Sequence, residues 1–545
     1  EGWQVWDLVQ RLGGQLRVSA SKLQELNLET DGVVNASTVS TITSSSISAL
    51  DTLYAAGGAG QISGLGAEAV TLNDTTGVSA AALKAIDDYN SGGTIDASSI
   101  TQISGSASNM AAVYGSARIS GLGDETGANN ILVTDAGGTA AAADLNTIIA
   151  KIQATDASVD LVVDANITTI TGTAADIRTL YTSLTDGEVT GLGGENITIT
   201  GETTSSADDI NYIVGKTTGT VTATGNTKFT GTLTQMQAFQ TNKDAGDIQT
   251  KLVYDATLLD DGTLDAADLN ALLGAGKILG SVDMTAATQV TGTESELDTF
   301  LTVNVEGGKF SPSSSLTIDV SDTTPVTSVS AAKLNTYDLY VTGAGSVTAT
   351  QATTTTGTVS DISTALTAAG ISVASDIDAS FDLITSATDQ NVTDINSIIA
   401  NTTGTVTGTV TGTPQRMADI TLSTASGGDA TKNLTVNAVG SGDLTALNLS
   451  EVDTLTLDDT TTLPDSDADM PPTVDFGSQN VTLSGNININ SITTSNLGTF
   501  AVGSNTLTGS AAKLDGVTVG GAGTTAVTAL HSTLDADLSG IDTTT

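Results

Sequence analysis

The sequence predicts a β-rich repeat solenoid, in which strand–helix coils of about 30 residues carry short capped helices and stack their strands into parallel sheets. Three observations predict this fold class: a short phrase recurs along the chain, its copies are regularly spaced, and a β-branched segment precedes many of them. Four copies occupy residues 173–181, 206–214, 265–273 and 391–399. Arrays of this kind usually act through length and surface.

Each copy of the phrase predicts a short amphipathic helix. In one copy, Ile177, Leu180 and Tyr181 have the i, i+3, i+4 spacing of a single helical face. Four residues before the first apolar position stands a Ser, Thr, Asp or Asn in most copies, and an Asp or Glu often follows three residues later, as in a capping box. The expected caps include Ser19, Ser46, Ser79, Ser106, Thr173, Ser206, Asp265, Thr293, Ser330, Thr358, Asn391 and Ser510.

Strands are expected on both sides of these helices. Segments such as 100–105 and 167–172 are rich in Thr and Ile and end in Gly, which favours a strand followed by a sharp turn. A second motif, at 62–66, 119–123 and 189–193, recurs at intervals of 57 and 70 residues, so the unit is interpreted as a pair of alternating half-repeats. Strands stack more closely than helices pack, so either a superhelical twist or helices alternating on two sides would fit.

Three regions are expected along the chain. Residues 1–18 contain both tryptophans and predict an amphipathic helix ended at Gly13-Gly14, either as a cap on the array or as a docking helix for another subunit. Residues 19–420 form the repeat solenoid, and residues 421–545 form a divergent, strand-rich C-terminal region. The first residue is Glu rather than Met, which suggests a chain that was processed, trimmed or taken from a longer protein.

Composition excludes several classes of function. The chain has 61 Asp and Glu against 17 Lys and Arg, a net charge of −44, which opposes binding to nucleic acid and favours cations. It contains no Cys, so disulfides, Cys-based zinc sites and thiol catalysis are excluded. No run of 18 apolar residues is present, so no membrane insertion is expected.

Calcium is the best chemical candidate for a bound group. Residues 88–99 match several positions of an EF-hand-type loop, with Asp88, Asn90 and Asp96 as the candidate metal ligands. Position twelve is Ser99, where a bidentate Glu normally lies, and a turn followed by a helix cap would explain the same residues. Calcium is therefore a possible cofactor, and no other cofactor is expected.

Catalysis has little support in the sequence. The single histidine, His531, lies near leucines without a nucleophile motif, which is more typical of a structural residue. Carboxylates are abundant, but the few arginines are too scattered to mark a groove that could cleave a polysaccharide. We expect no enzyme.

The phrases at 170–177, 119–124 and 266–270 resemble the repeats of large surface proteins of marine cyanobacteria, and similar repeats in structural proteins of their phages. The resemblance implies a noncatalytic, extracellular protein and supplies no site residues. We expect a structural repeat protein at the cell surface that forms an S-layer, a filament or an adhesin. Its partners are expected to be further copies of itself, with cell-surface glycans as another candidate. The alternatives are a virion fibre or appendage protein and a polysaccharide-active β-solenoid enzyme.

Overall fold

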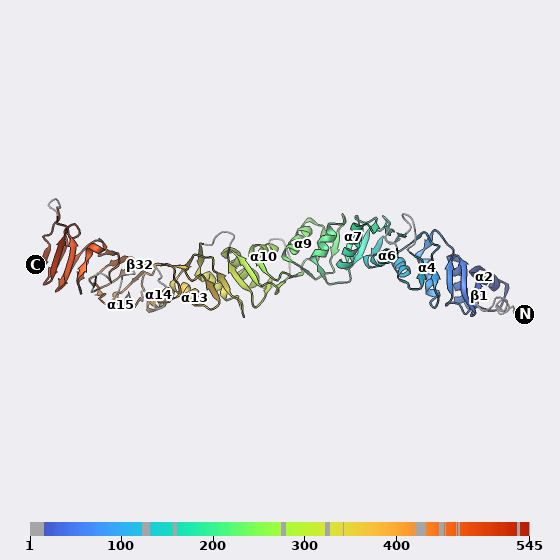
Figure 1. The fold of residues 1–545 in the computed structure, drawn as a ribbon, viewed down its shortest axis with the longest axis horizontal. Coiled ribbons are helices and arrows are strands. Elements are labelled where there is room, and N and C mark those ends of the chain that lie inside the picture. Colours follow the sequence, from blue (N-terminus) through green and yellow to red (C-terminus); the bar gives the residue numbers. More distant parts are fainter. Residues whose placement is uncertain are drawn as a thin grey trace. The chain divides into compact units, whose positions relative to one another are not determined.

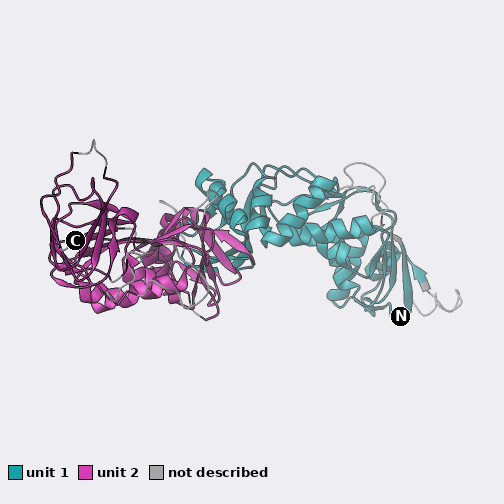
Figure 2. Ribbon diagram, turned by 60° about the vertical axis from the view of Figure 1, so that its left-hand side comes forward, with its two compact units in different colours: residues 1–259, 272–283 teal, residues 260–271, 284–545 magenta. Residues whose placement is uncertain are grey.

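The structure is a computed structural model of the chain. It describes residues 16–122, 131–155, 161–273, 280–321, 327–341, 343–417, 419–420, 432–445, 452, 454–464, 466, 469–530 and 535–543. The predicted N-terminal helix with its two tryptophans, and His531, lie outside these residues. Two compact units are present (Figure 2): unit 1 comprises 1–259 and 272–283, and unit 2 comprises 260–271 and 284–545.

Unit 1 alternates short strands with helices (Figure 1). Its helices are α2 (Ala20–Glu29), α3 (Ile47–Gly58), α4 (Ala80–Tyr89), α5 (Ala107–Gly115), α6 (Ala142–Thr155), α7 (Ala174–Asp186), α8 (Ala207–Val214) and α9 (Leu233–Ala245). Its strands are β1 (Leu16–Val18), β2 (Val34–Asn35), β3 (Val39–Ser45), β4 (Ile62–Ser63), β5 (Ala69–Leu72), β6 (Val78–Ser79), β7 (Ile95–Asp96), β8 (Ile103–Gly105), β9 (Ile119–Ser120), β10 (Ile131–Val133), β11 (Thr139–Ala141), β12 (Leu161–Val163), β13 (Thr169–Gly172), β14 (Val189–Thr190), β15 (Asn196–Ile199), β16 (Thr204–Ser206), β17 (Val221–Ala223), β18 (Lys228–Gly231), β19 (Ile248–Thr250) and β20 (Asp255–Leu258). Strand β22 (Val282–Met284) spans a boundary between the residue ranges of the two units.

Unit 2 repeats this pattern and then becomes mainly β-structure. Its helices are α10 (Ala266–Leu272), α11 (Glu294–Asp298), the π-helix η1 (Thr299–Val305), α12 (Ala331–Asp338), α13 (Val359–Thr367), α14 (Asp389–Asn401), α15 (Pro414–Met417) and the 3-10 helix η3 (Ile489–Ser491). Its strands are β21 (Thr263–Asp265), β23 (Gln289–Gly292), β24 (Phe310–Pro312), β25 (Thr317–Val320), β26 (Ser328–Ser330), β27 (Val347–Ala349), β28 (Thr354–Gly357), β29 (Ile371–Val373), β30 (Asp378–Phe381), β31 (Val406–Gly412), β32 (Lys432–Ala438), β33 (Gly442–Asp443), β34 (Thr454–Leu457), β35 (Thr461–Thr462), β36 (Thr473–Asp475), β37 (Asn480–Thr482), β38 (Ile487–Asn488), β39 (Thr493–Ser495), β40 (Thr499–Gly503), β41 (Thr506–Ser510), β42 (Thr518–Gly521), β43 (Thr524–Thr528) and β44 (Ile541–Thr543).

The strands form staggered parallel sheets. In unit 1 a strand usually pairs with the second strand along the chain, giving the orders β1-β3-β5-β7-β9, β6-β8-β10-β12-β14 and β11-β13-β15-β17-β19. A new sheet therefore starts after every five strands and two helices. This arrangement confirms the alternating strand–helix units and the parallel sheets, and it is compatible with a repeat solenoid. Residues 16–18, predicted to belong to the N-terminal cap, form β1.

The helices of unit 1 lie in one row. Each helix from α2 to α8 packs against the next one in the sequence, up to α9. The buried face carries the predicted apolar triplet, since Ile177, Leu180 and Tyr181 have no exposed surface. The sequence left open an arrangement in which successive helices alternate between two sides of the solenoid. That arrangement is wrong for unit 1, because its successive helices pack against each other.

Most predicted caps are confirmed. Ser19, Ser46, Ser106, Thr173, Ser206, Thr293 and Thr358 each accept a hydrogen bond from the amide three residues later, and Asp265 accepts from Ala267 and Asp268. Ser79 and Ser330 occupy the cap position without this side-chain bond.

One predicted cap is wrong. Helix α14 begins one turn earlier than expected, because Thr388 and Asn391 form a capping box in which Asn391 is inside the first turn. Ser510 ends strand β41, and its hydroxyl accepts from the amide of Lys513 at 3.3 Å as a cap would, but the residues that follow form a turn instead of a helix.

A small-residue contact recurs at the start of every second helix. The first residue of α2, α4, α6, α8, α10 and α12 is an alanine with no exposed surface. The strand before the following helix ends in glycine in most copies, and a Cβ atom placed on Gly105 would lie 2.9 Å from the Cβ of Ala80. The same distance is 2.9 Å for Gly292 and Ala266. Further copies are Gly172 with Ala142 at 3.3 Å, Gly231 with Ala207 at 3.2 Å and Gly357 with Ala331 at 3.7 Å.

The described helices also bear on membrane insertion. None of those within the described ranges is both long enough and apolar enough to cross a bilayer.

Replacing Gly105 by Val should destabilise unit 1 by about 1–3 kcal/mol, because the added atoms overlap Ala80. The measurement is the free energy of unfolding in urea, followed by circular dichroism. Gly58→Val in α3 is the matched control, since nothing lies within 4 Å of its added Cβ. Combining Gly105→Ala with Ala80→Gly should recover part of the loss seen in Gly105→Ala alone, and additive effects would contradict the contact.

Candidate functional site: polar contacts between neighbouring helices

The three predicted calcium ligands have separate protein partners. The Asp88 carboxylate, on α4, pairs with Lys84 at 2.6 Å. Asn90 is fully buried, its Oδ1 accepts from the backbone amide of Glu68 at 3.2 Å, and its Nδ2 donates to the Glu68 carbonyl at 2.8 Å. Asp96 ends β7 and accepts from the backbone amide and hydroxyl of Ser98 at 3.1 and 2.7 Å.

The structure therefore gives these residues roles in a surface ion pair, an inter-coil contact and a turn. Among the described residues, no group of three or more His, Cys, Asp or Glu side chains is arranged to hold a metal ion. The calcium site stays a prediction.

The polar side chain that recurs most regularly is an asparagine on alternate helices. Its Nδ2 donates to a backbone carbonyl near the start of the next helix in four copies, and to one just after the short helix α15 in the fifth. The pairs are Asn146 with Asp176 at 2.8 Å, and Asn211 with Gln235, Asn270 with Glu296, Asn335 with Asp361 and Asn396 with Asp419, each at 2.9 Å. Gln24 makes the equivalent contact with Ala49 in the first copy, and Lys84 occupies this position in α4.

In two copies the asparagine also joins the far end of the next helix. The Oδ1 of Asn211 accepts from Nδ2 of Asn242 at 3.0 Å, and the Oδ1 of Asn270 accepts from Nδ2 of Asn304 at 2.7 Å. Asn211 and Asn270 therefore each form hydrogen bonds near both ends of the helical segment that follows. Such contacts fix the axial position of one helix against the next.

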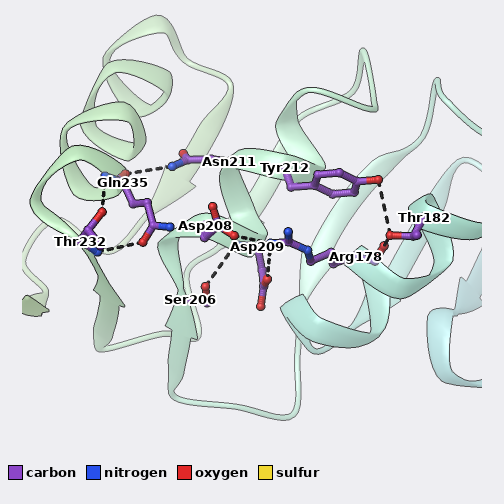
Figure 3. Close-up of polar contacts among 9 residues, drawn as sticks. All are labelled: Arg178, Thr182, Ser206, Asp208, Asp209, Asn211, Tyr212, Thr232 and Gln235. Atoms are coloured by element: carbon purple, nitrogen blue, oxygen red, sulfur yellow. Dashed lines mark hydrogen bonds and ion pairs between the residues drawn. The ribbon is translucent and has the colours of Figure 1, made fainter. Parts of the chain in front are cut away.

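An ion pair extends this network between α7 and α8 (Figure 3). Arg178 lies 2.5 Å from the Asp208 carboxylate and 2.8 Å from that of Asp209, and its guanidinium lies 4.9 Å from the centre of the Tyr212 ring. The hydrogen bonds to Asp208 and then Asp209 raise the pKa of Arg178. The side chains of Arg178 and Asp208 are 37% and 47% exposed, so solvent screens the pair and its contribution is below about 1 kcal/mol.

The other end of the Tyr212 ring reaches α7. The hydroxyl of Thr182 donates to the Tyr212 oxygen at 3.5 Å, and this hydrogen bond is the main cause that lowers the pKa of Tyr212. The Thr232–Gln235 capping box in the same view starts α9, directly beside the carbonyl that Asn211 binds.

Buried carboxylates close the loops that follow some helices. Glu195 is 4% exposed, and it accepts from the Tyr181 hydroxyl at 2.8 Å and from the backbone amide of Gly193 at 2.9 Å. Glu68 is 1% exposed and accepts from the Tyr54 hydroxyl at 3.2 Å in the same way. In each copy the Tyr precedes the Glu by 14 residues, and the Glu lies two residues after a Gly-Leu-Gly sequence.

A third loop uses a different pair at the same spacing. There Gln240 donates to the Tyr254 hydroxyl, and both residues are buried. The two positions, 14 residues apart, therefore form a buried hydrogen bond in this loop as well, although Gln replaces Tyr at the first and Tyr replaces Glu at the second.

The asparagines and the Arg178 ion pair join one coil to the next, whereas the buried carboxylates hold the loops that follow their helices. Comparison of the chain with protein-family models gives no match, and comparison with curated proteins gives none.

Replacing Asn211 by Ala should cost about 1–3 kcal/mol, because it removes a bond to Gln235 and leaves the half-buried amide of Asn242 without its acceptor. Urea unfolding measures the loss. Asn242→Ala removes only the second bond and should cost less, and the double variant should show coupling. Strictly additive effects would contradict the contact of Asn211 with both ends of α9.

Alkaline pH should destabilise the fold. Burial raises the pKa of Tyr54, Tyr181, Tyr254 and Tyr337, so the folded chain keeps these phenols protonated when the unfolded chain has lost the protons. Their contribution is therefore complete below a pH of about 10 and is lost as the pH rises further. Thermal unfolding at increasing pH, with phenolate absorbance, measures it.

Tyr181→Phe should weaken this alkaline loss, whereas Tyr212→Phe should not weaken it, because Tyr212 is half-exposed and its lowered pKa opposes the loss. Titration of every tyrosine near its ordinary pKa in a fully folded chain would contradict the burial argument.

Proposed function

We propose that this chain is an extracellular structural repeat protein that forms a cell-surface layer, filament or adhesin by assembling with itself. One observation carries the proposal: the polar groups that recur along the chain bind neighbouring coils. Asn211 and Arg178 act in this way, and Glu195 closes the loop within its own coil. A sequence that keeps such an asparagine on alternate helices maintains a scaffold of regular geometry.

In this proposal the coils of the chain form a continuous solenoid. Successive helices of unit 1 pack in one row above parallel sheets, which supports this arrangement. The acidic composition also supports an exposed role, because a net charge of −44 opposes nonspecific aggregation of a long polar surface. The resemblance to bacterial surface proteins points in the same direction, and we propose no catalytic role.

Electron microscopy of the purified chain tests the proposal. We expect filaments or sheets in millimolar calcium. Their loss after chelation, and return on adding calcium back, would make calcium part of the assembly, whereas persistence would show that it is not. Isolated particles in both conditions would overturn self-assembly and favour a fibre or tethered adhesin. Antibody labelling of intact source cells tests the location, and labelling only after lysis would contradict it.

A further inference from the structure

Unit 2 contains a sheet face on which threonines occupy the same register position on five consecutive strands. The residues are Thr409 on β31, Thr435 on β32, Thr454 on β34, Thr473 on β36 and Thr493 on β39. We call this set the threonine row. Two residues further along the same strands lies a companion row: Thr411, Asn437, Thr456, Asp475 and Ser495.

Both rows lie on the outer face of the sheet. The residues between them on the first four strands, Val410, Val436, Leu455 and Val474, are at most 2% exposed and fill the core. Since side chains alternate along a strand, the rows on either side of these residues face away from the core. The row residues are half-buried or exposed, as expected where identical side chains shield one another.

The rows form a regular two-dimensional grid. All four strand pairings are parallel, and they contain no register shift over these residues. Neighbouring threonines in a row are therefore about 4.8 Å apart, and the two rows are about 6.6 Å apart, the rise of two residues in a parallel strand. Each threonine of the grid carries a hydroxyl and a methyl group.

The chemistry of the grid excludes several partners. It contains no Lys or Arg to neutralise phosphates and no aromatic ring to stack on a sugar or to anchor a protein interface. Asp475 is its one charged residue, and this carboxylate accepts from the amide of Gly477 at 3.0 Å and from Nδ2 of Asn496 at 2.8 Å. In a chain of net charge −44, a nearly neutral face suits a neutral partner with a repeating array of oxygen atoms.

We propose that the threonine row and its companion row bind the surface of ice. The oxygen atoms on the prism faces of hexagonal ice repeat at a distance close to the strand spacing, so successive hydroxyls can occupy successive lattice positions. The methyl groups between them exclude disordered water, which favours an ordered layer. The inference does not depend on self-assembly, because one chain carries the whole grid.

Partition into slowly growing ice tests the proposal on the full chain. We expect wild-type protein to be enriched several-fold in the ice fraction over a carrier protein in the same solution, and to slow ice recrystallisation. Thr435→Lys and Thr454→Lys should each reduce the enrichment to the level of the carrier, because a long charged side chain breaks the grid.

Thr393→Lys is the matched control. It makes the same change on the exposed side of α14 in the same unit, and it should partition like wild type. Circular dichroism establishes that each variant is folded, and two variants in the row guard against loss of structure in one. Wild-type protein at carrier level in the ice, or folded Thr435→Lys and Thr454→Lys variants as enriched as wild type, would overturn the proposal. Binding to crystalline cellulose without binding to ice would also overturn it.

Discussion

The contact between a strand-end glycine and the first alanine of the preceding helix limits how closely two coils can approach. At Gly105 and Ala80 the backbone of one coil lies directly on the Cβ of the other, so no larger residue fits without displacement. In the first copy Ser45 takes the place of the glycine, and its hydroxyl accepts the amide hydrogen of Ala20 at 2.8 Å. Both versions bring the start of a helix close to the next strand, where its cap and its asparagine contact can form.

The close approach of one coil to the next also explains why the sheets are staggered. Helices pack about 8–10 Å apart, whereas strands stack at about 4.8 Å, so a row of adjacent helices outgrows a sheet that gains one strand per helix. Unit 1 has five strands for every two helices, and consecutive strands belong to different sheets. Each sheet therefore lengthens by about 6 Å for each helix, which is closer to the helix spacing. Each strand pairs with the second strand along the chain, and the number of strands for every two helices is odd. The first strands of a sheet therefore come from segments before helices, and its last strands come from segments after helices. Each sheet then ends, and a new one begins.

Local features could be predicted from the sequence, and contacts between coils could not. The caps at Thr173 and Ser206 depend on residues within one turn, so the phrase reveals them. The partner of Asn211 lies 24 residues away, and its identity depends on which helix is adjacent. The contact of Asn90 could not be predicted for the same reason, because its amide is bound to the backbone of Glu68 on the preceding coil. The 14-residue spacing of Tyr and Glu, next to a Gly-Leu-Gly motif, is the signal in the sequence for the buried carboxylates.

The long sheet of unit 2 continues past α15 into a part of the chain whose described elements are mainly strands. The sheet that contains β31 has eight strands, in the order β26-β28-β30-β31-β32-β34-β36-β39, whereas the sheets within unit 1 have at most five. Between β32 and β39 the described elements are strands and the single-turn η3, so no helix row sets a wider spacing. Consecutive coils can then advance by one strand each and keep the same residue position in register. A row of threonines extends over five strands here, whereas in unit 1 the row of Thr171, Thr198 and Thr222, which is also in register, ends at Gln249 on β19.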